Sequence, residues 1–279
     1  MPNQFNEFQK HKDFLVCVDS DGCAMDTMDV KHEKAFCPEL IRVFGLQEYA
    51  DFITPYWMQI NLYRSTRGIN RFKGMLMTLE ELNYNKGVEI PNLKEISHWV
   101  NSAKELSNPN LEVQIAAGNI ALEKVLEWSL AVNKVIREMP EDDKPFAGAK
   151  EGLEAAHLVA DTAVVSSANA GAIYSEWNRH GLSQYMNVML GQEVGTKAVC
   201  IQELIKNRYD KDKVLMVGDA LGDLEAAQKN GVLFYPILVG KEEESWKRLS
   251  EEALPKLLHG MYAGAYQEQL IKEQRSILK

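Results

Sequence analysis

Short apolar runs that stop abruptly at polar residues recur along this chain, and each predicts a buried β-strand. The first is Phe14–Val18, whose length and two valines favour a strand over a helix. Three later runs have the same form, namely Ala163–Ser167, Val214–Asp219 and Leu233–Val239. Pro236 in the last run indicates an edge strand or a bulge, because proline cannot donate a hydrogen bond to a neighbouring strand.

Helical patterns separate these runs in the later part of the chain, over Lys197–Asn207 and Asp223–Asn230. Strands that alternate with helices predict a parallel sheet with helices on both faces. In such sheets the loops at the carboxyl ends of the strands carry the functional site. Asp19, Ser166 and Asp219 each stand at such an end.

The stretch 29–147 has a different pattern, with helical periodicity and almost no strand-like run. Apolar residues recur at spacings of three and four in Asn92–Leu106 and Asn119–Met139. We therefore predict an α/β protein with a discontinuous Rossmann-like core over 1–28 and 148–279. An all-helical domain is expected to be inserted in this parallel-sheet core over 29–147.

Composition and charge narrow the classes of function. The chain has 46% hydrophobic and 25% charged residues, as folded globular proteins do. Its 31 Lys and Arg against 40 Asp and Glu give a net charge of −9, which disfavours nucleic acid and anionic membranes as partners. The four cysteines form neither a CxxC pair nor a zinc spacing, and no apolar run approaches the ~18–20 residues that span a bilayer. We expect a cytoplasmic protein whose charged, helical segment 242–279 packs on the core or on a partner.

Paired acidic residues follow the first predicted strand, in Asp19-Ser-Asp21-Gly22. Side chains two apart leave a strand on the same face, and Gly22 permits a sharp turn after them. Two such carboxyl groups can act as nucleophile and as general acid and base. The alternative is an ordinary Asx-rich turn that ends the strand.

A hydroxyl and a lysine stand at two further element ends. Ser166 can donate to a phosphoryl oxygen or cap the next helix, and Ser167 and Asn169 compete for either role. Lys197 lies at the start of a predicted helix, where the helix dipole disfavours a cation. Its position indicates an anionic partner, although a solvated surface lysine is the alternative.

Two more acidic residues follow a later strand, in Gly218-Asp219-x-x-x-Asp223. Together with Asp19 they would form an oxygen-rich, strongly negative pocket. Such a pocket needs a hard cation, and Mg²⁺ is the expected occupant. Asp223 alone would be an ordinary cap of the following helix.

The order of these four motifs resembles that of the haloacid dehalogenase superfamily of phosphatases and phosphotransferases. The resemblance covers about 13–28 and 145–240, on both sides of the insertion. It includes the wider first motif Asp19–Asp26 and the approach Pro145–Leu153. Cys23 departs from the pattern, since Thr or Val is usual there, and we expect it to be a small buried residue.

The resemblance implies a mechanism. The first Asp of the opening motif is the nucleophile in that superfamily, which corresponds to Asp19 here and implies an aspartyl-phosphate intermediate. Asp21 would protonate the leaving oxygen and then activate the hydrolytic water. Ser166 and Lys197 match the residues that hold the phosphoryl oxygens.

The resemblance also implies Mg²⁺ as cofactor. Its ligands would be the Asp19 carboxylate, the Asp21 backbone carbonyl and Asp219, with Asp223 either a ligand or just outside the ligand set. A second Asp at the position of Asp21 favours phosphate esters, because an alkoxide leaving group needs a proton. Dehalogenase-like and phosphonatase-like members lack this residue.

The insertion matches in position the helical cap of the superfamily, which closes over the site and selects the substrate. Within it the segment Asn61–Lys73 is basic. If one helix continues through Gly68, three arginines share a face and could bind a second anionic group of the substrate: Arg64, Arg67 and Arg71. The alternative is a solvated basic face paired with Glu80 and Glu81.

We therefore expect a Mg²⁺-dependent phosphatase that acts on a small soluble phosphomonoester, so that the expected partner is a phosphorylated metabolite. A phosphosugar mutase with the same machinery is the first alternative. A non-catalytic binding or regulatory protein is the second. The sequence leaves the physiological substrate and the oligomeric state open.

Overall fold

The computed structural model describes residues 5, 8–139, 143–206 and 208–279. The chain forms two compact units. One comprises 1–28 and 143–279 and contains the sheet, and the other comprises 29–142. We call them the sheet unit and the helical unit.

The sheet unit is built on five strands that pair only in parallel, in the order β3-β2-β1-β4-β5. The strands are β1 (Leu15–Val18), β2 (Asp161–Val165), β3 (Val188–Leu190), β4 (Val214–Gly218) and β5 (Leu233–Pro236). Val18 at the end of β1 is level with Val164 and with Val217, so the carboxyl ends of three adjacent strands meet at one edge. The predicted α/β class with a parallel sheet is confirmed.

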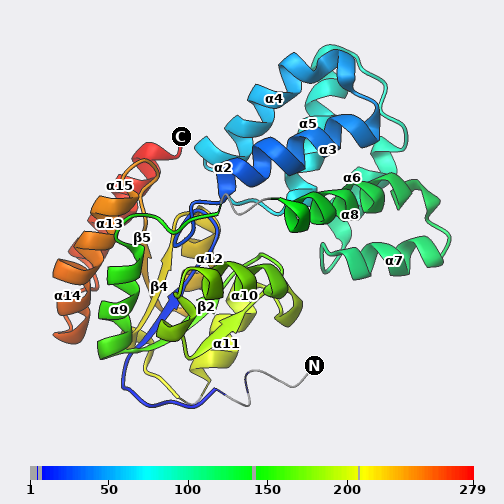
Figure 1. Ribbon diagram of the computed structural model, residues 1–279. Helices are drawn as coiled ribbons and strands as arrows, with labels where there is room; N and C mark the ends of the chain where they lie inside the picture. The colour runs from blue at the N-terminus through cyan, green and yellow to red at the C-terminus, as the bar shows by residue number, and fades with distance from the viewer. Residues whose placement is uncertain (1–4, 6–7, 140–142, 207) are drawn as a thin grey trace. The chain divides into compact units, whose positions relative to one another are not determined.

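Helices cover both faces of this sheet (Figure 1). They are α9 (Ala149–Val159), α10 (Ala170–Arg179), α11 (Lys197–Ile205), α12 (Leu221–Asn230), α13 (Glu242–Arg248), α14 (Leu254–Leu258) and α15 (Ala265–Ile277). Alternate residues of β1 enter different apolar clusters, since Val16 and Val18 pack with α9 and α13 while Leu15 and Cys17 pack with α11 and α12. Because β1 is buried on both faces of the sheet, its sequence is continuously apolar instead of alternating.

The four predicted strands are all present; β1, β4 and β5 are shorter than their apolar runs, whereas β2 starts two residues before its run. β5 ends at Pro236 and lies at an edge of the sheet, as the proline predicts. β3 was not predicted, because its three residues are too few to show a strand-like pattern of apolar and polar positions. The predicted helix from Lys197 ends at Ile205, and Asn207 lies outside the described residues.

The C-terminal segment 242–279 packs on the core, which was one of the two predicted alternatives; the other was packing on a partner. Trp246, Leu254 and Leu270 belong to the same buried cluster as the strand residues. α15 covers the edge strand: Phe234 N donates to Gln267 Oε1 at 2.8 Å, and Tyr262 Oη donates to Phe234 O at 2.7 Å. These contacts occupy the backbone groups that an exposed edge would offer to another chain.

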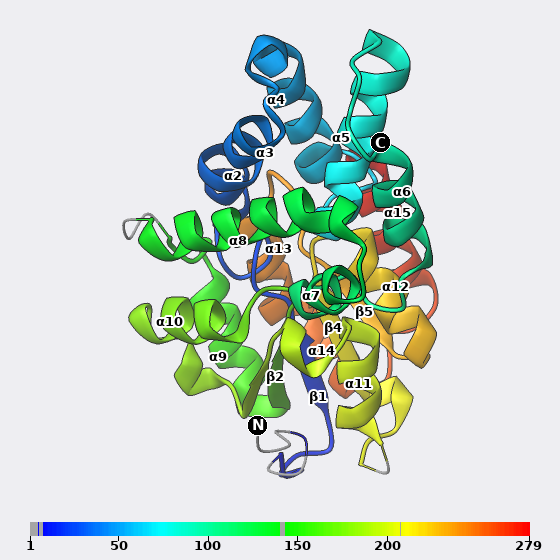
Figure 2. The same cartoon turned by 90° about the vertical axis from the view of Figure 1, so that its right-hand side faces the viewer.

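The described residues of the helical unit contain helices and turns but no strand (Figure 2). Its helices are α2 (Met28–Lys31, which starts at the boundary), α3 (Cys37–Phe44), α4 (Ala50–Met58), α5 (Arg71–Lys86), α6 (Leu93–Ser102), α7 (Asn108–Ala116) and α8 (Glu123–Glu138). Its core combines aliphatic and aromatic side chains, and the rings of Trp57 and Trp128 meet edge to face with centroids 6.2 Å apart.

In the described part of the chain, no helix combines the length and the apolar character that crossing a bilayer requires.

Candidate active site

Asp19 directly follows β1, and backbone hydrogen bonds fix its position. Asp19 N donates to Val217 O at 3.0 Å, which extends the ladder to β4 by one residue. Ser20 N donates to Asp19 Oδ1 at 2.8 Å, and Trp177 Nε1 of α10 donates to Ser20 Oγ at 2.8 Å. The chain then turns back sharply, with Gly22 at φ 80° in the left-handed region.

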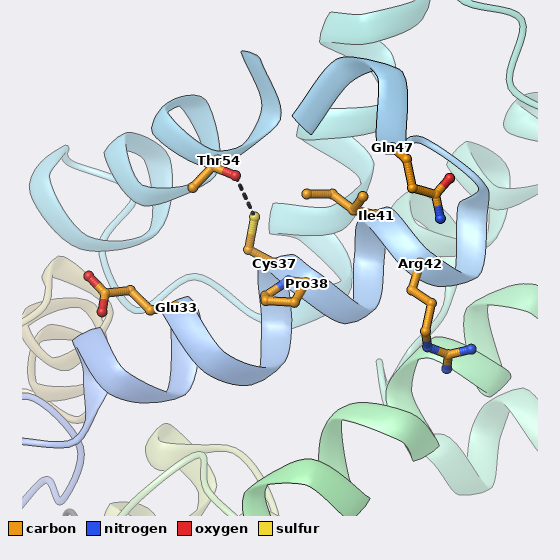
Figure 3. Close-up of a pocket in the computed structure, with 7 residues that line it drawn as sticks. All are labelled: Glu33, Cys37, Pro38, Ile41, Arg42, Gln47 and Thr54. Carbon is orange, nitrogen blue, oxygen red and sulfur yellow. Dashed lines mark hydrogen bonds between the residues drawn. The ribbon is translucent and has the colours of Figure 1, made fainter. Parts of the chain in front are cut away.

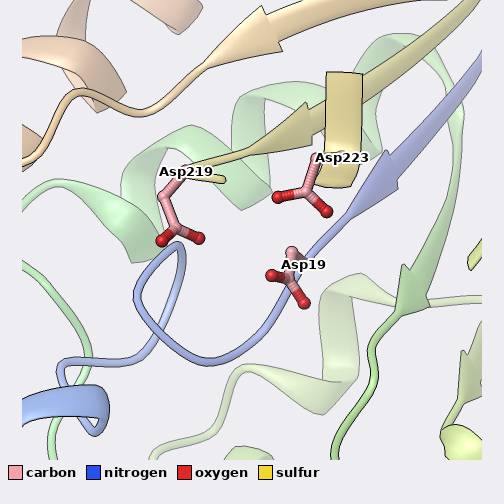
Figure 4. A group of neighbouring side chains, drawn as sticks. All are labelled: Asp19, Asp219 and Asp223. Carbon is pink, nitrogen blue, oxygen red and sulfur yellow. The ribbon is translucent and has the colours of Figure 1, made fainter. Parts of the chain in front are cut away.

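Three buried aspartates converge at the carboxyl ends of β1 and β4 (Figure 4). Asp19 follows β1, Asp219 follows β4, and Asp223 lies in the first turn of α12. Each offers a carboxylate oxygen, and these oxygens all lie within 4.8 Å of one another. A Cβ on Gly218 would lie 2.3 Å from Asp223 Oδ2, so only glycine fits beside this cluster.

Lys197 supplies the positive charge of the cluster. Its Nζ lies 2.7 Å from Asp19 Oδ2 and donates to Asp223 Oδ1 at 2.6 Å. Burial alone would lower the pKa of the Lys197 ammonium, but the two carboxylates raise the pKa overall. The lysine is therefore a permanent cation at the start of α11, and its anionic partners are Asp19 and Asp223.

The pKa of the Asp19 carboxyl group lies well above its ordinary value. Burial raises its pKa to about 8; Lys197 opposes the rise, whereas the carboxylates of Asp223 and Asp219 add to it. A carboxyl group with a pKa this high binds a proton readily, and a bound cation of higher charge would displace that proton.

The donor set fits a divalent cation. With all groups ionised, the three carboxylates and the one ammonium leave two uncompensated negative charges in a buried site. Carboxylate oxygens are the ligands that hard cations such as Mg²⁺ prefer. Asp223 accepts from Lys197 through Oδ1 and from Ala220 N through Oδ2, and Asp19 is contacted at both oxygens in the same way, by Ser20 N and by Lys197.

Asp21 is oriented by a residue that the sequence analysis did not single out. Thr27 is fully buried, and its Oγ1 donates to Asp21 Oδ1 at 2.7 Å. The backbone of Asp21 also pairs with Met25, which closes the loop after β1. The only signal in the sequence was the position of Thr27 directly after the motif Asp19–Asp26.

Ser166 follows β2 and is buried, and its Oγ accepts from Ala168 N at 3.2 Å. Ser167 is exposed. Asn169 caps α10, because its Oδ1 accepts from Gly171 N and its Nδ2 donates to Glu193. Asn169 is therefore the residue that caps α10, which is one of the two roles considered for it, the other being a contact to a phosphoryl oxygen.

Cys23 is fully buried, and its Sγ lies 3.7 Å from Val217 O. Burial raises the pKa of this thiol well above its ordinary value, so the thiol stays protonated. Cys23 is the small packed residue that was expected.

Comparison with known proteins identifies the family. Haloacid dehalogenase-like hydrolases match residues 69–237, which is more than half of the 279 residues. The chain belongs to this family. Asp19 and Asp21 lie outside the matched range, so their assignment depends on the site geometry. No curated protein matches the sequence.

Solved structures of similar fold include three proteins of low sequence identity. A Lactobacillus delbrueckii protein provisionally assigned as a phosphoglycolate phosphatase is 14% identical, with 96% of this chain and 99% of that chain covered and a TM-score of 0.51, which indicates a shared fold. A provisionally assigned phosphatase from Clostridium difficile is 20% identical, with coverages of 81% and 86% and a TM-score of 0.47. An L-2-haloacid dehalogenase from Xanthobacter autotrophicus is 15% identical, with coverages of 94% and 88% and a TM-score of 0.40.

The predicted arginine face of this haloacid dehalogenase-like hydrolase is absent, because the helix does not continue through Gly68. A π-helical turn ends at Tyr63, Arg64 is extended, and Gly68 has a φ of 69°. α5 begins only at Arg71. Arg64 and Arg71 therefore lie on different elements, separated by a turn.

The three arginines have different surroundings. Arg64 is exposed, whereas Arg67 is buried and its Nη1 donates to Leu62 O at 2.8 Å. Arg71 donates to Asn133 Oδ1 at 2.7 Å and lies over the Phe36 ring. Glu80 and Glu81, the expected partners of a solvated basic face, instead accept from other side chains: Ser97 and Asn85, respectively.

The helical unit of this family member carries a small cavity of about 340 Å³ (Figure 3). Its lining residues are Glu33, Cys37, Pro38, Ile41, Arg42, Gln47 and Thr54. The Cys37 thiol points toward Thr54, with Sγ and Oγ1 3.8 Å apart. Burial raises the pKa of this thiol, and none of the predicted site residues lines the cavity.

Proposed function

We propose that this protein is a Mg²⁺-dependent phosphatase that hydrolyses a small phosphomonoester through an aspartyl-phosphate. The observation that carries the proposal is the position of Lys197, whose ammonium lies between Asp19 and Asp223 beside Asp219. Phosphoryl transfer needs a positioned nucleophile and positive charge near the phosphoryl oxygens, and this arrangement offers both.

Asp19 is the proposed nucleophile. The Ser20 amide holds one of its oxygens and Lys197 the other, which aims the carboxylate from a rigid strand end. A carboxylate oxygen attacks phosphorus in line, so that an Asp19–phosphorus bond forms while the bond from phosphorus to the ester oxygen breaks. Lys197 and Ser166 then contact oxygens of the transferring group, and a bound Mg²⁺ would neutralise part of their charge.

Asp21 is the proposed general acid and base. It donates a proton to the departing ester oxygen, then accepts a proton from the water that attacks the aspartyl-phosphate and releases phosphate. Its hydrogen bond from Thr27 supports this role, because it fixes the orientation of the carboxyl group. A halide ion needs no proton on departure, so an oriented second carboxyl group favours esters over haloacids as substrates.

Substrate selection is proposed for the helical unit, in the role of a cap. One or more of Arg64, Arg67 and Arg71 would bind a second anionic group, such as a carboxylate or a distal phosphate. Exchange of each for Gln should raise KM for a doubly anionic substrate far more than KM for a simple ester. Arg64 is the clearest test because it is exposed, and an unchanged KM in all three variants would contradict the idea.

The proposal is tested by hydrolysis of a chromogenic phosphate ester with Mg²⁺, with EDTA, and with Asp19→Asn protein. Turnover should require Mg²⁺ and should be lost in D19N. Asp210→Asn is the matched control, since the Asp210 side chain is exposed and pairs only at the surface with Lys213. Metal-independent turnover, or full turnover in D19N, would contradict the proposal.

Product analysis separates hydrolysis from the mutase alternative. A phosphatase releases inorganic phosphate from a sugar phosphate, whereas a mutase returns the phosphoryl group to another hydroxyl of the sugar. Trapping of phosphate on Asp19 is expected in both cases, and its absence would favour a non-catalytic binding protein.

A further inference from the structure

The last helix of the chain reaches the backbone of a candidate metal ligand. Gln274 of α15 donates from Nε2 to Asp219 O at 3.0 Å. The Gln274 residue is 1% exposed, and it lies 55 positions along the chain from its partner. The C-terminal helix therefore contacts the turn that carries Asp219 between β4 and α12.

α15 is itself held firmly, so that Gln274 presents its amide from a fixed position. Gln267 lies about two helical turns before Gln274, and its Oε1 accepts from Phe234 N of β5 at 2.8 Å. Arg248 of α13 pairs with Glu273 at 2.9 Å, and Leu270 is buried in the main cluster. The helix thus has anchors on both sides of its buried face.

A primary amide is an unfavourable group for this buried position. Only its Nε2 is used, because no described residue donates to Gln274 Oε1. Burial of a polar atom without a partner costs free energy, and a Leu or Met would fill a comparable volume without that cost. What the amide provides, and an apolar side chain could not, is the hydrogen bond to the Asp219 carbonyl.

We infer that Gln274 is a positioning residue that holds the Asp219 turn in the geometry that binds the divalent cation. A hydrogen bond to the Asp219 carbonyl restricts rotation of the peptide group between Asp219 and Ala220. The Cα of Asp219, from which the carboxylate side chain extends, is thereby held in place. Ligands that are oriented before the cation arrives bind it more tightly than mobile ligands do. The inference rests on the proposed function, since it concerns the same cation site.

The test compares Gln274→Met with Gln267→Met. Both variants lose a hydrogen bond of α15 without a large change in side-chain size, but only Gln274 contacts the Asp219 turn. We expect Q274M to bind Mg²⁺ about tenfold more weakly, measured by the Mg²⁺-induced rise in melting temperature and by the half-saturating Mg²⁺ concentration for turnover. Q267M should melt earlier but bind Mg²⁺ as the wild type does. Equal Mg²⁺ affinities in the two variants would overturn the inference.

A second measurement needs no substitution and covers the case in which Q274M does not fold. If Gln274 supports the cation site, linkage requires that the cation also supports α15. Hydrogen exchange of the α15 amides in wild-type protein should slow when Mg²⁺ is added, and unchanged exchange would overturn the inference.

The wild type separates the two possible failures. If wild-type protein shows neither Mg²⁺-induced stabilisation nor Mg²⁺-dependent turnover, the proposed function fails and the inference fails with it. If the wild type responds to Mg²⁺ but Q274M and Q267M respond alike, the inference alone fails.

Discussion

The ammonium nitrogen of Lys197 lies 2.7 Å from Asp19 Oδ2, which places the one buried cation of the cluster on the proposed nucleophile itself. The same nitrogen donates to Asp223 at 2.6 Å, so the lysine is held from two directions. In the proposed reaction, Lys197 would keep its contact with Asp223 while it turns toward the oxygens of the phosphoryl group. Asp223 would then act mainly on Lys197.

Lys197→Met should reduce kcat for a phosphate ester by about 100- to 1000-fold, because the transition state loses a charged donor. The substitution also leaves two buried carboxylates without the cation between them, so the metal-free protein should be less stable. Steady-state kinetics and urea unfolding measure both effects. Lys206→Met, directly after the end of the same helix, is the control, since Lys206 is exposed and, among the described residues, pairs at the surface with Glu203; similar kinetics in the two variants would contradict the assignment.

Thr27→Val removes the donor to Asp21 while it keeps the shape of a fully buried side chain. The general acid would then be less well oriented, and kcat for an alkyl phosphate should fall about tenfold. Nitrophenyl phosphate should be affected less, because its leaving group departs without a proton. The ratio of the two kcat values is the measurement.

Thr78→Val is the matched control for Thr27→Val. Thr78 is also fully buried, but it donates to Gly74 O within α5 of the helical unit. Loss of that hydrogen bond should cost about 1 kcal/mol of stability and leave the ratio of kcat values unchanged. A ratio that moves equally in both variants would mean that Thr27 has no particular effect on Asp21.

Gly218→Ala should destabilise the protein by about 1–3 kcal/mol, because the added Cβ would overlap the Asp223 carboxylate. Gly222→Ala should do the opposite and stabilise by about 0.5 kcal/mol, since it lies in α12 with no atom within 4 Å of the new Cβ. Chemical denaturation of both variants measures the difference. A Gly218→Ala protein as stable as the wild type would show that Asp223 can move.

The raised pKa of Asp19 makes the stability of the metal-free protein depend on pH. Its pKa rises from 3.8 in the ordinary state to about 8 through burial, with Lys197 opposing and the other two carboxylates adding. Asp19 therefore makes its full contribution to the free energy of unfolding below about pH 4, and this contribution is lost as the pH rises toward 8.

The Asn side chain of the Asp19→Asn variant stays neutral, so this variant should not lose stability as the pH rises. Measured in EDTA, the stability of D19N relative to wild type should grow by about 1 kcal/mol or more between pH 5 and pH 8. Asp210→Asn serves again as the exposed control and should show no such growth. A difference that does not change with pH would mean that Asp19 ionises normally in the folded protein.

Much of the sheet unit was predictable because its signals are local. The apolar runs that became β1 and β4 end directly at Asp19 and Asp219, and a parallel sheet brings such ends together. β3 escaped prediction because three residues, Val188–Leu190, become a strand only through pairing with β2. The arginine face failed because the helix ends at Tyr63, and the turn that follows, with Gly68 in a left-handed conformation, separates Arg64 from Arg71.

The contacts that support the site were not predictable from spacing. Thr27 lies six positions from Asp21, but the spacing alone does not indicate their hydrogen bond. Gln274 is an ordinary residue in sequence, and it lies 55 positions from the partner that gives it its proposed role. Trp177 is similar, since its donation to Ser20 spans 157 positions. Motif patterns indicate the candidate reacting groups, whereas tertiary packing determines which residues contact and orient them.

The discontinuous sheet unit also has a consequence for how the protein is made. β1 is the central strand of the sheet, yet Leu15 pairs with Asp161 and Val214, so synthesis delivers this strand first and its neighbours much later. The whole helical unit, which is compact by itself, leaves the ribosome in between. The nascent chain must therefore carry an apolar, unpaired strand until β2 and β4 have been synthesised, and Asp19, the proposed nucleophile, reaches its final position only when β4 arrives.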